Sequence, residues 1–128
     1  MSIYGAFDIA GSGLQAQRVR MDAVTANLAN QRTPEFEVMQ VRFEAGDPDS
    51  GNPLGVHVAG VDRLPMFNPV KDPDNPAARE DGFVYYPAVD YATAMVDGIE
   101  ALRAYEANIQ AVEATRSMID AGLRVLAS

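Results

Sequence analysis

Three groups of residues have types and spacings that could support chemistry. The first is the run Gly11, Gly13 and Ala16, which spells the G-x-G-x-x-A pattern of a dinucleotide-binding turn. That turn follows a β-strand, but only ten residues without strand character precede Gly11. Dinucleotide binding through Gly11-Ser12-Gly13 is therefore a remote alternative, and an absence of binding at millimolar ligand would dispose of it.

The second group is the single histidine, His57, on a strand-like segment without a nucleophile in catalytic spacing. This setting favours a role on a strand face over catalysis. The sequence has no cysteine, which excludes disulfides, thiol catalysis and thiolate metal sites.

The third group is acidic. An EF-hand calcium loop needs Gly at its sixth position and Glu at its twelfth, and runs that start at Asp47 or Asp72 have neither. Glu80 and Asp81 lie in a polar loop, where solvation predicts ordinary pKa values. We therefore predict no catalytic, cofactor or metal site, and no enzymatic activity.

Composition limits the partners. The 128 residues have a formal net charge of -8, which argues against nucleic acid or an anionic membrane as the main partner. No segment approaches the ~20 apolar residues of a membrane span. The N-terminal residues also have no pattern of a cleavable signal peptide, so we expect none.

The C-terminal run from Tyr91 to Leu126 is the strongest structural signal. It contains no proline, and its helix-favouring residues predict one helix of roughly 50 Å. A seven-residue repeat predicts an apolar stripe of two columns. The columns are Met95, Leu102, Ile109, Arg116 and Leu123, and Gly98, Tyr105, Val112, Ile119 and Leu126.

A matching stripe at the other end of the chain predicts its partner. The N-terminal helix should end near Asn30, because Thr33-Pro34 disfavours helical backbone. Its stripe is Ile3, Phe7, Ala10, Leu14, Gln17, Met21, Val24 and Leu28. If the two helices pair side by side in opposite directions, Arg18 would lie near Glu106. Ser2 can cap this helix, and the glycines inside it require a reason, such as the close approach of a neighbouring backbone.

The middle of the chain predicts a small β segment. Alternating apolar residues indicate a strand over 35–44 with one slip near Met39, and a second over 54–61 that forms a hairpin with it. Residues 47–53 should form a turn. Four prolines exclude regular structure between Asp62 and Asp81, and Phe83 to Tyr86 is a last short strand. The fold class is therefore mainly α with a small β insert, its long terminal helices pairing as an antiparallel coiled coil.

Two strings at opposite ends of the chain carry a resemblance. SGLQAQRVRMDAVTANLANQRTP, from Ser12 to Pro34, resembles the N-terminal signature of bacterial flagellar rod and hook proteins. MVDGIEALRAYEANIQAVEATRSM, from Met95 to Met118, is similar to the matching C-terminal motif, with RAYEAN its most specific part. Residues 68–90 resemble the middle segment of a short member of this family.

The resemblance implies an axial structural subunit. Such proteins are exported by the flagellar type III apparatus without a cleaved signal and stack helically into the periplasmic proximal rod of the basal body. It implies other rod subunits, a rod-base export component and self-association as partners, with residues 1–33 and 91–128 as the inner assembly domain and 34–90 as an outer segment. The chain departs from the family where Glu35 and Glu37 flank Phe36, and where Asn75 replaces a usual histidine.

Stripes and resemblance together predict an assembly interface on both helices. Its residues are Phe7, Leu14, Met21, Val24, Asn27, Leu28, Asn30, Leu102, Arg103, Tyr105, Glu106, Asn108, Ile109, Val112, Ile119 and Leu123. Because an apolar stripe needs cover, we also expect the helices of the free subunit to be loosely ordered. The alternative is a small coiled-coil adaptor, which would form a defined homodimer in sedimentation.

Overall fold

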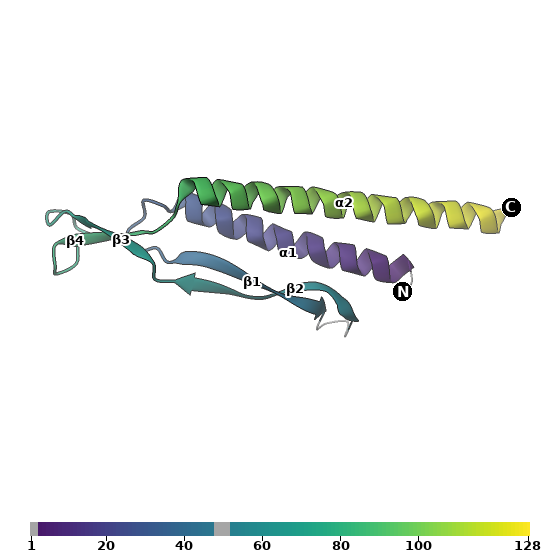
Figure 1. Ribbon diagram of the computed structural model, residues 1–128, viewed down its shortest axis with the longest axis horizontal. Coiled ribbons are helices and arrows are strands. Elements are labelled where there is room, and N and C mark those ends of the chain that lie inside the picture. The colour runs from purple at the N-terminus through teal and green to yellow at the C-terminus, as the bar shows by residue number, and fades with distance from the viewer. Residues whose placement is uncertain (1–2, 48–51) are drawn as a thin grey trace.

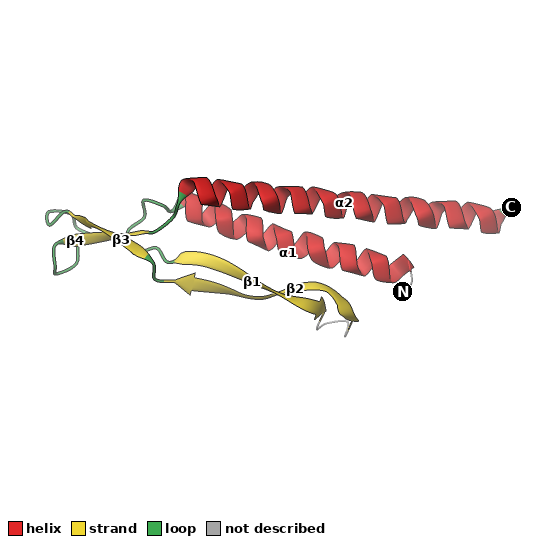
Figure 2. Cartoon of the chain, viewed as in Figure 1, coloured by secondary structure: helices red, strands yellow, loops and turns green. Residues whose placement is uncertain are grey.

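The chain folds into two long helices joined by two β-ribbons. A computed structural model describes residues 3–47 and 52–128. The helices are α1 (Ile3–Ala29) and α2 (Tyr91–Ala127), shown in red in Figure 2. The strands between them are β1 (Val38–Asp47), β2 (Asn52–Leu64), β3 (Phe67–Lys71) and β4 (Phe83–Pro87). The expected fold class, mainly α with a β insert, is confirmed. Ser2 and residues 48–51, where a cap and part of a turn were predicted, lie outside the described residues.

The molecule is elongated, and α1 is its middle layer. Figure 1 shows α1 and α2 side by side and running in opposite directions, so that both ends of the chain lie at one end of the molecule. The β1–β2 ribbon packs along the other side of α1. The β3–β4 ribbon projects beyond the opposite end of the helices.

Small residues form the contact between the helices. Ala101 is 0% exposed and Thr115 is 8% exposed. A Cβ added to Gly13 would meet the side-chain amide of Asn108 at 2.8 Å, so the predicted close approach at this glycine comes from a side chain. Gly11 has nothing within 4 Å of such a Cβ among the described residues.

The stripe of α2 is displaced from one of its predicted columns. In the other predicted column, Gly98, Tyr105, Val112 and Ile119 are at least partly covered, as expected, but Leu126 is exposed. The second covered column of α2 is shifted by one residue toward the N-terminus relative to the prediction. Its residues are smaller than the predicted ones, and small residues let the helices approach more closely. The covered residues are Ala94, Ala101, Asn108 and Thr115. Of the predicted column, Ile109 is half-buried, while Met95, Leu102, Arg116 and Leu123 are exposed.

The β1–β2 ribbon is an antiparallel hairpin fixed to α1 by two polar side chains. The side-chain amide of Asn27 donates to the carbonyl of Met39 at 2.9 Å, and its oxygen accepts from the Met39 N–H at 2.8 Å. Nearer the N-terminus, the Ser12 hydroxyl accepts from the Val56 N–H at 3.2 Å. Both strands of the hairpin are therefore tied to one face of α1.

The predicted hairpin is confirmed, with corrected boundaries. β1 begins at Val38 and not at residue 35, because Glu35 has a left-handed φ of 62° in the turn that leaves α1. The register shifts between Arg42 and Phe43, where β2 contributes the extra residue Ala59. The slip expected near Met39 is therefore wrong in position by a few residues.

The expectation that residues 62–81 lack regular structure is wrong. β2 continues to Leu64, and β3 pairs with β4 from Phe67↔Pro87 to Lys71↔Phe83, with Pro69 opposite Tyr85. Proline is tolerated in this strand because both strands of a two-stranded ribbon are edges, where a missing N–H need not break a ladder. The predicted strand from Phe83 is confirmed and includes Pro87.

The dinucleotide alternative is also wrong. Gly11, Ser12 and Gly13 lie inside the continuous helix α1, and no strand or turn leads into them from Ile3 onward. The Ser12 hydroxyl donates to the Ile9 carbonyl at 2.7 Å, besides its bond to β2. The backbone N–H groups that would bind a pyrophosphate are therefore engaged in the helix.

Candidate assembly surface

An apolar groove lies between the C-terminal half of α1 and the start of α2. Its volume is about 240 Å³. It is lined by Met21, Val24, Thr25, Leu28, Ala94, Met95, Gly98, Ile99 and Leu102. The sequence reasoning named Met21, Val24, Leu28 and Leu102 as interface residues but missed Ile99, whose spacing from Met95 and Leu102 places it on the same helix face.

The groove is shaped by the contrast between small and large side chains. At Gly98 the helices are in contact, because Val24 Cγ1 lies 3.5 Å from the position a Cβ would occupy there, an ordinary van der Waals distance. The side chains of Met95, Ile99 and Leu102 line the groove near this contact and are 39%, 47% and 47% exposed. These three large apolar side chains thus remain half open to solvent in the single chain.

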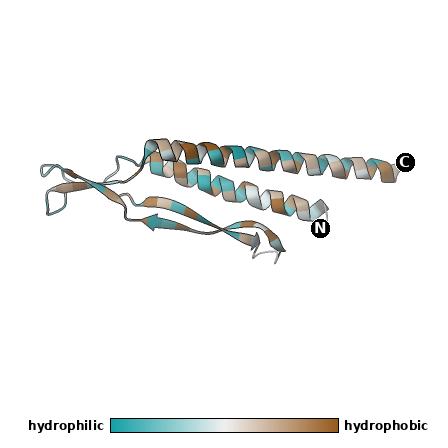
Figure 3. Cartoon of the chain, in the orientation of Figure 1, coloured by the Kyte–Doolittle hydropathy of each residue, from teal (hydrophilic) through white to brown (hydrophobic). Residues whose placement is uncertain are grey.

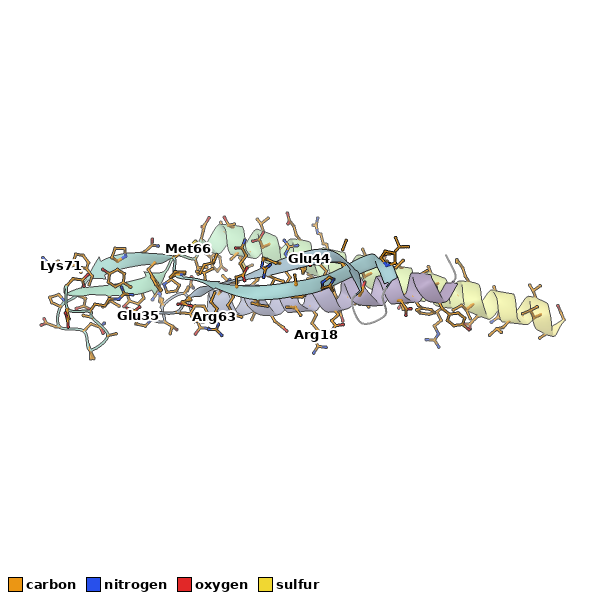
Figure 4. The ribbon with its side chains drawn as sticks, turned by 90° about the horizontal axis from the view of Figure 1, so that it is seen from below. Arg18, Glu35, Glu44, Arg63, Met66 and Lys71 are labelled. Atoms are coloured by element: carbon orange, nitrogen blue, oxygen red, sulfur yellow. The ribbon has the colours of Figure 1, made fainter. Side chains whose placement is uncertain are left out.

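The edge of the groove carries an ion-pair cluster. The Arg20 guanidinium lies 3.3 Å from Glu100 and 3.7 Å from Asp97, so it forms ion pairs with both carboxylates. The predicted proximity of Arg18 to Glu106 is wrong. Among the described residues Arg18 forms no ion pair with Glu106, and its side chain points away from the helices (Figure 4).

The end of α2 forms a second bare surface, the overhang, which comprises residues 118–127. α2 has 37 residues and α1 has 27, and in Figure 1 the C-terminal end of α2 extends past the start of α1. Met118, Leu123, Val125 and Leu126 are 57%, 59%, 74% and 85% exposed. Brown, apolar segments accordingly reach the end of α2 in Figure 3.

The predicted interface residues occupy three kinds of position. Asn27 is buried and holds the hairpin, as described above. The exposed members are Leu102, Arg103, Glu106 and Leu123. The half-buried members are Phe7, Leu14, Met21, Val24, Leu28, Asn30, Tyr105, Asn108, Ile109, Val112 and Ile119.

Three polar residues of the helices are engaged or buried within the chain. The Asn30 side-chain amide donates to the Ala26 carbonyl at 2.8 Å, a carbonyl that also accepts the Asn30 backbone N–H at 3.0 Å. The Asn108 amide donates to the Ala104 carbonyl at 2.9 Å. Gln17 is the weak residue of the predicted stripe, and its Oε1 is buried without a hydrogen-bond partner among the described residues.

A separate charged and aromatic cluster fixes the β3–β4 ribbon to the turn after α1. Arg79 Nε donates to Glu35 at 2.6 Å, and the guanidinium carbon lies 3.8 Å from the centre of the Tyr85 ring. The Glu35 N–H donates to the Tyr85 carbonyl at 2.8 Å. Phe67 packs edge-on against Tyr85 with ring centres 6.3 Å apart.

Hydrogen bonds in this cluster shift the pKa of its acids. The bond from Arg79 lowers the pKa of Glu35 and raises that of Arg79. The Tyr85 hydroxyl donates to Asp81, which lowers the pKa of Asp81 and raises that of Tyr85. The Phe83 N–H also donates to Asp81 and lowers its pKa further. The ordinary pKa predicted for Asp81 is therefore wrong, and the direction of the shift keeps this carboxylate ionised.

His57 occupies the strand face predicted for it. Its Nδ1 lies 2.9 Å from the Gly46 carbonyl, and its Nε2 lies 3.6 Å from Glu44, the residue opposite it in the hairpin. Across residues 3–47 and 52–128, no three potential metal ligands of the His, Cys, Asp or Glu type gather. No helix in the same ranges is long and apolar enough to cross a membrane.

Comparison with known proteins decides the family. A family model described as flagella basal body rod protein matches residues 7–36, and one described as flagellar basal body rod FlgEFG protein C-terminal matches residues 80–125. The chain is 36% identical to the flagellar basal-body rod protein FlgC of Aquifex aeolicus over 94% of each chain. The chain belongs to the flagellar basal-body rod protein family. FlgC of Bacillus subtilis is 33% identical over 98% of this chain and 99% of its own, and FlgC of Salmonella typhimurium is 35% identical over 93% and 94%.

Family membership settles the class of protein. The relatives are structural rod proteins, so the chain is a structural component of the flagellar basal body and not an enzyme. The groove and the overhang are consequently candidate contacts between protein subunits.

Glu35 and Asn75, where the sequence led us to expect departures from the family, lie at the β3–β4 ribbon or in the turn bonded to it. Glu35 accepts a hydrogen bond from Arg79, and Asn75 forms hydrogen bonds within the loop between β3 and β4. The Asn75 side chain donates to Asp72 at 3.2 Å and accepts from the Ala77 N–H at 2.9 Å. Each of these residues therefore has a structural role within this chain.

Proposed function

We propose that the chain polymerises helically into the proximal rod of the flagellum through its terminal helices. The observation that carries this proposal is the large apolar surface that the helix pair leaves bare, at the groove and along the overhang. Monomeric proteins rarely expose large side chains in contiguous patches unless a partner covers them. A rod protein meets such partners in its neighbouring subunits.

The proposal extends to partners, export and architecture. Residues 1–33 and 91–128 form the inner assembly domain, in which α1 and α2 pair as an antiparallel coiled coil. Residues 34–90 form the outer segment, with the β1–β2 ribbon along α1 and the β3–β4 ribbon beyond the end of the helices. Other rod subunits and the rod-base export component adjoin the chain, which reaches the periplasm through type III export without a cleaved signal.

Leu102→Asp tests the proposal in a motile bacterium whose own copy has been replaced. Leu102 is half exposed in the single chain, so the aspartate is tolerated by the fold, whereas burial of its charge between subunits costs several kcal/mol. We expect normal synthesis and loss of the variant from isolated basal bodies. Val96→Asp is the matched control, because Val96 is exposed on α2 and does not line the groove.

Normal motility and normal basal bodies with Leu102→Asp would contradict the proposal. A stable homodimer of the purified wild-type chain that persists on dilution, without larger assemblies, would support the coiled-coil adaptor instead.

A further inference from the structure

The two bare apolar surfaces lie at opposite ends of the helix pair. The groove is formed where α2 begins, and the overhang is the stretch where α2 ends. We propose that the overhang of one copy of this chain docks in the groove of a second copy. This inference rests on the proposed function, because it names the partner of the assembly surface.

The overhang continues a stripe that α1 covers elsewhere. Along α2 the side facing α1 includes Gly98, Ala101, Asn108 and Thr115, and the same spacing continues to Gly122 and Leu126. Gly98 has Val24 within 3.5 Å of an added Cβ, whereas Gly122 has nothing within 4 Å among the described residues. The overhang therefore has a helix-pairing face without the helix that would cover it.

The dimensions of the two surfaces agree. α2 is ten residues longer than α1 (37 against 27), which corresponds to an unmatched length of ~15 Å at about 1.5 Å per residue. The groove follows α2 from Ala94 to Leu102, a distance of ~12 Å by the same rise. The overhang is therefore long enough to span one groove.

The charges of the two surfaces do not oppose docking. The groove edge has Asp97 and Glu100 sharing Arg20, which leaves one negative charge in excess, and both carboxylates stay about half exposed or more. The overhang contains Asp120 and Arg124, a net charge of zero in a chain of net charge -8, and Arg116 lies just before it. This segment can thus approach the groove of a like-charged molecule.

The geometry of the contact predicts its consequence. The groove and the overhang are different surfaces, so a docked pair still has one free groove and one free overhang. Further copies can bind to these, and the association is head-to-tail and open-ended. A pairing of two identical surfaces would instead close at a dimer.

Disulfide crosslinking tests the contact in the full-length chain, which has no cysteine of its own. Leu123→Cys places a thiol on the overhang and Ile99→Cys places one in the groove. We expect the doubly substituted protein to form a ladder of dimers, trimers and longer species on mild oxidation. The control combines Leu123→Cys with Val96→Cys, which is similarly exposed but outside the groove. The groove pair should crosslink about tenfold or more faster, because docking raises the effective concentration of the two thiols.

Crosslinking equal to that of the Val96 control would overturn the inference, as would dimers that form equally well with Leu123→Cys alone. Basal bodies from cells that carry Ile99→Asp separate this failure from failure of the proposed function. If the ladder is absent and Ile99→Asp is excluded from rods, the groove takes a different rod subunit and the second-copy inference is wrong, while the proposed function stands. If the ladder forms and rods with Ile99→Asp are normal, the proposed function is wrong.

Discussion

The β3–β4 ribbon and the helix pair differ in how far contacts within the chain complete them. In the ribbon, Val84 is fully buried, and Arg79 joins Glu35 and Tyr85 through hydrogen bonds and ring contacts. Among the described residues of the helix pair, the buried apolar residues are all alanines, and large apolar residues such as Leu102 and Leu126 remain exposed. The ribbon is thus held by contacts within one chain, whereas we propose that neighbouring chains cover the helices.

The link between α1 and the β1–β2 hairpin gives the largest effect on stability that we predict within the chain. Asn27→Ala removes both hydrogen bonds to Met39 and leaves partly buried backbone groups of the hairpin unpaired. We expect the free energy of unfolding, measured with urea, to fall by about 2 kcal/mol. Thr25→Ala is the control, because its exposed hydroxyl bonds only to the Met21 carbonyl in its own helix. An equal effect of the two substitutions would show that Asn27 does not hold the hairpin.

A smaller effect tests the close approach of the helices. Gly11→Ala should stabilise the protein by roughly 0.5–1 kcal/mol, because alanine favours a helix and nothing described obstructs its Cβ. Gly13→Ala meets the Asn108 amide, and we expect it to be less stable than Gly11→Ala by about 1 kcal/mol. Adding Asn108→Ala should remove that difference. Equal stabilisation by both single substitutions in urea unfolding would argue against the register described for α1 and α2.

The smallest effect concerns the pH response of the ribbon. The pKa of Glu35 is lowered in the folded chain by Arg79, so this pair stabilises the ribbon above the ordinary value of 4.5 and loses that contribution as the pH falls through the folded pKa. We expect NMR signals of Phe67 and Tyr85 to shift in this acid range, and Glu35→Gln to reduce the part of the shift that reports Glu35. Asp81 also titrates below its ordinary value of 3.8 and accounts for the remainder. A wild-type titration unchanged by Glu35→Gln would show that the pair does not hold the ribbon in solution.

Periodicity and turn residues predicted both helices, the hairpin and the last strand. They could not predict which face of α2 meets α1, because Ala101 and Thr115 carry no hydrophobic signal that exceeds that of Met95 or Leu102. The strand containing Pro69 was missed because the sequence does not show that it lies at an edge. Likewise, the contact of Arg79 with Glu35 joins residues 44 positions apart, and no local pattern brings them together.

Amide hydrogen exchange tests the central claim, that neighbouring subunits complete the helices, most directly. The free, dilute chain should exchange rapidly across residues 5–28 and 118–127, and the same amides should become protected when the chain is part of an assembled rod. Slow exchange across residues 5–28 in the free chain, unchanged by assembly, would contradict the account.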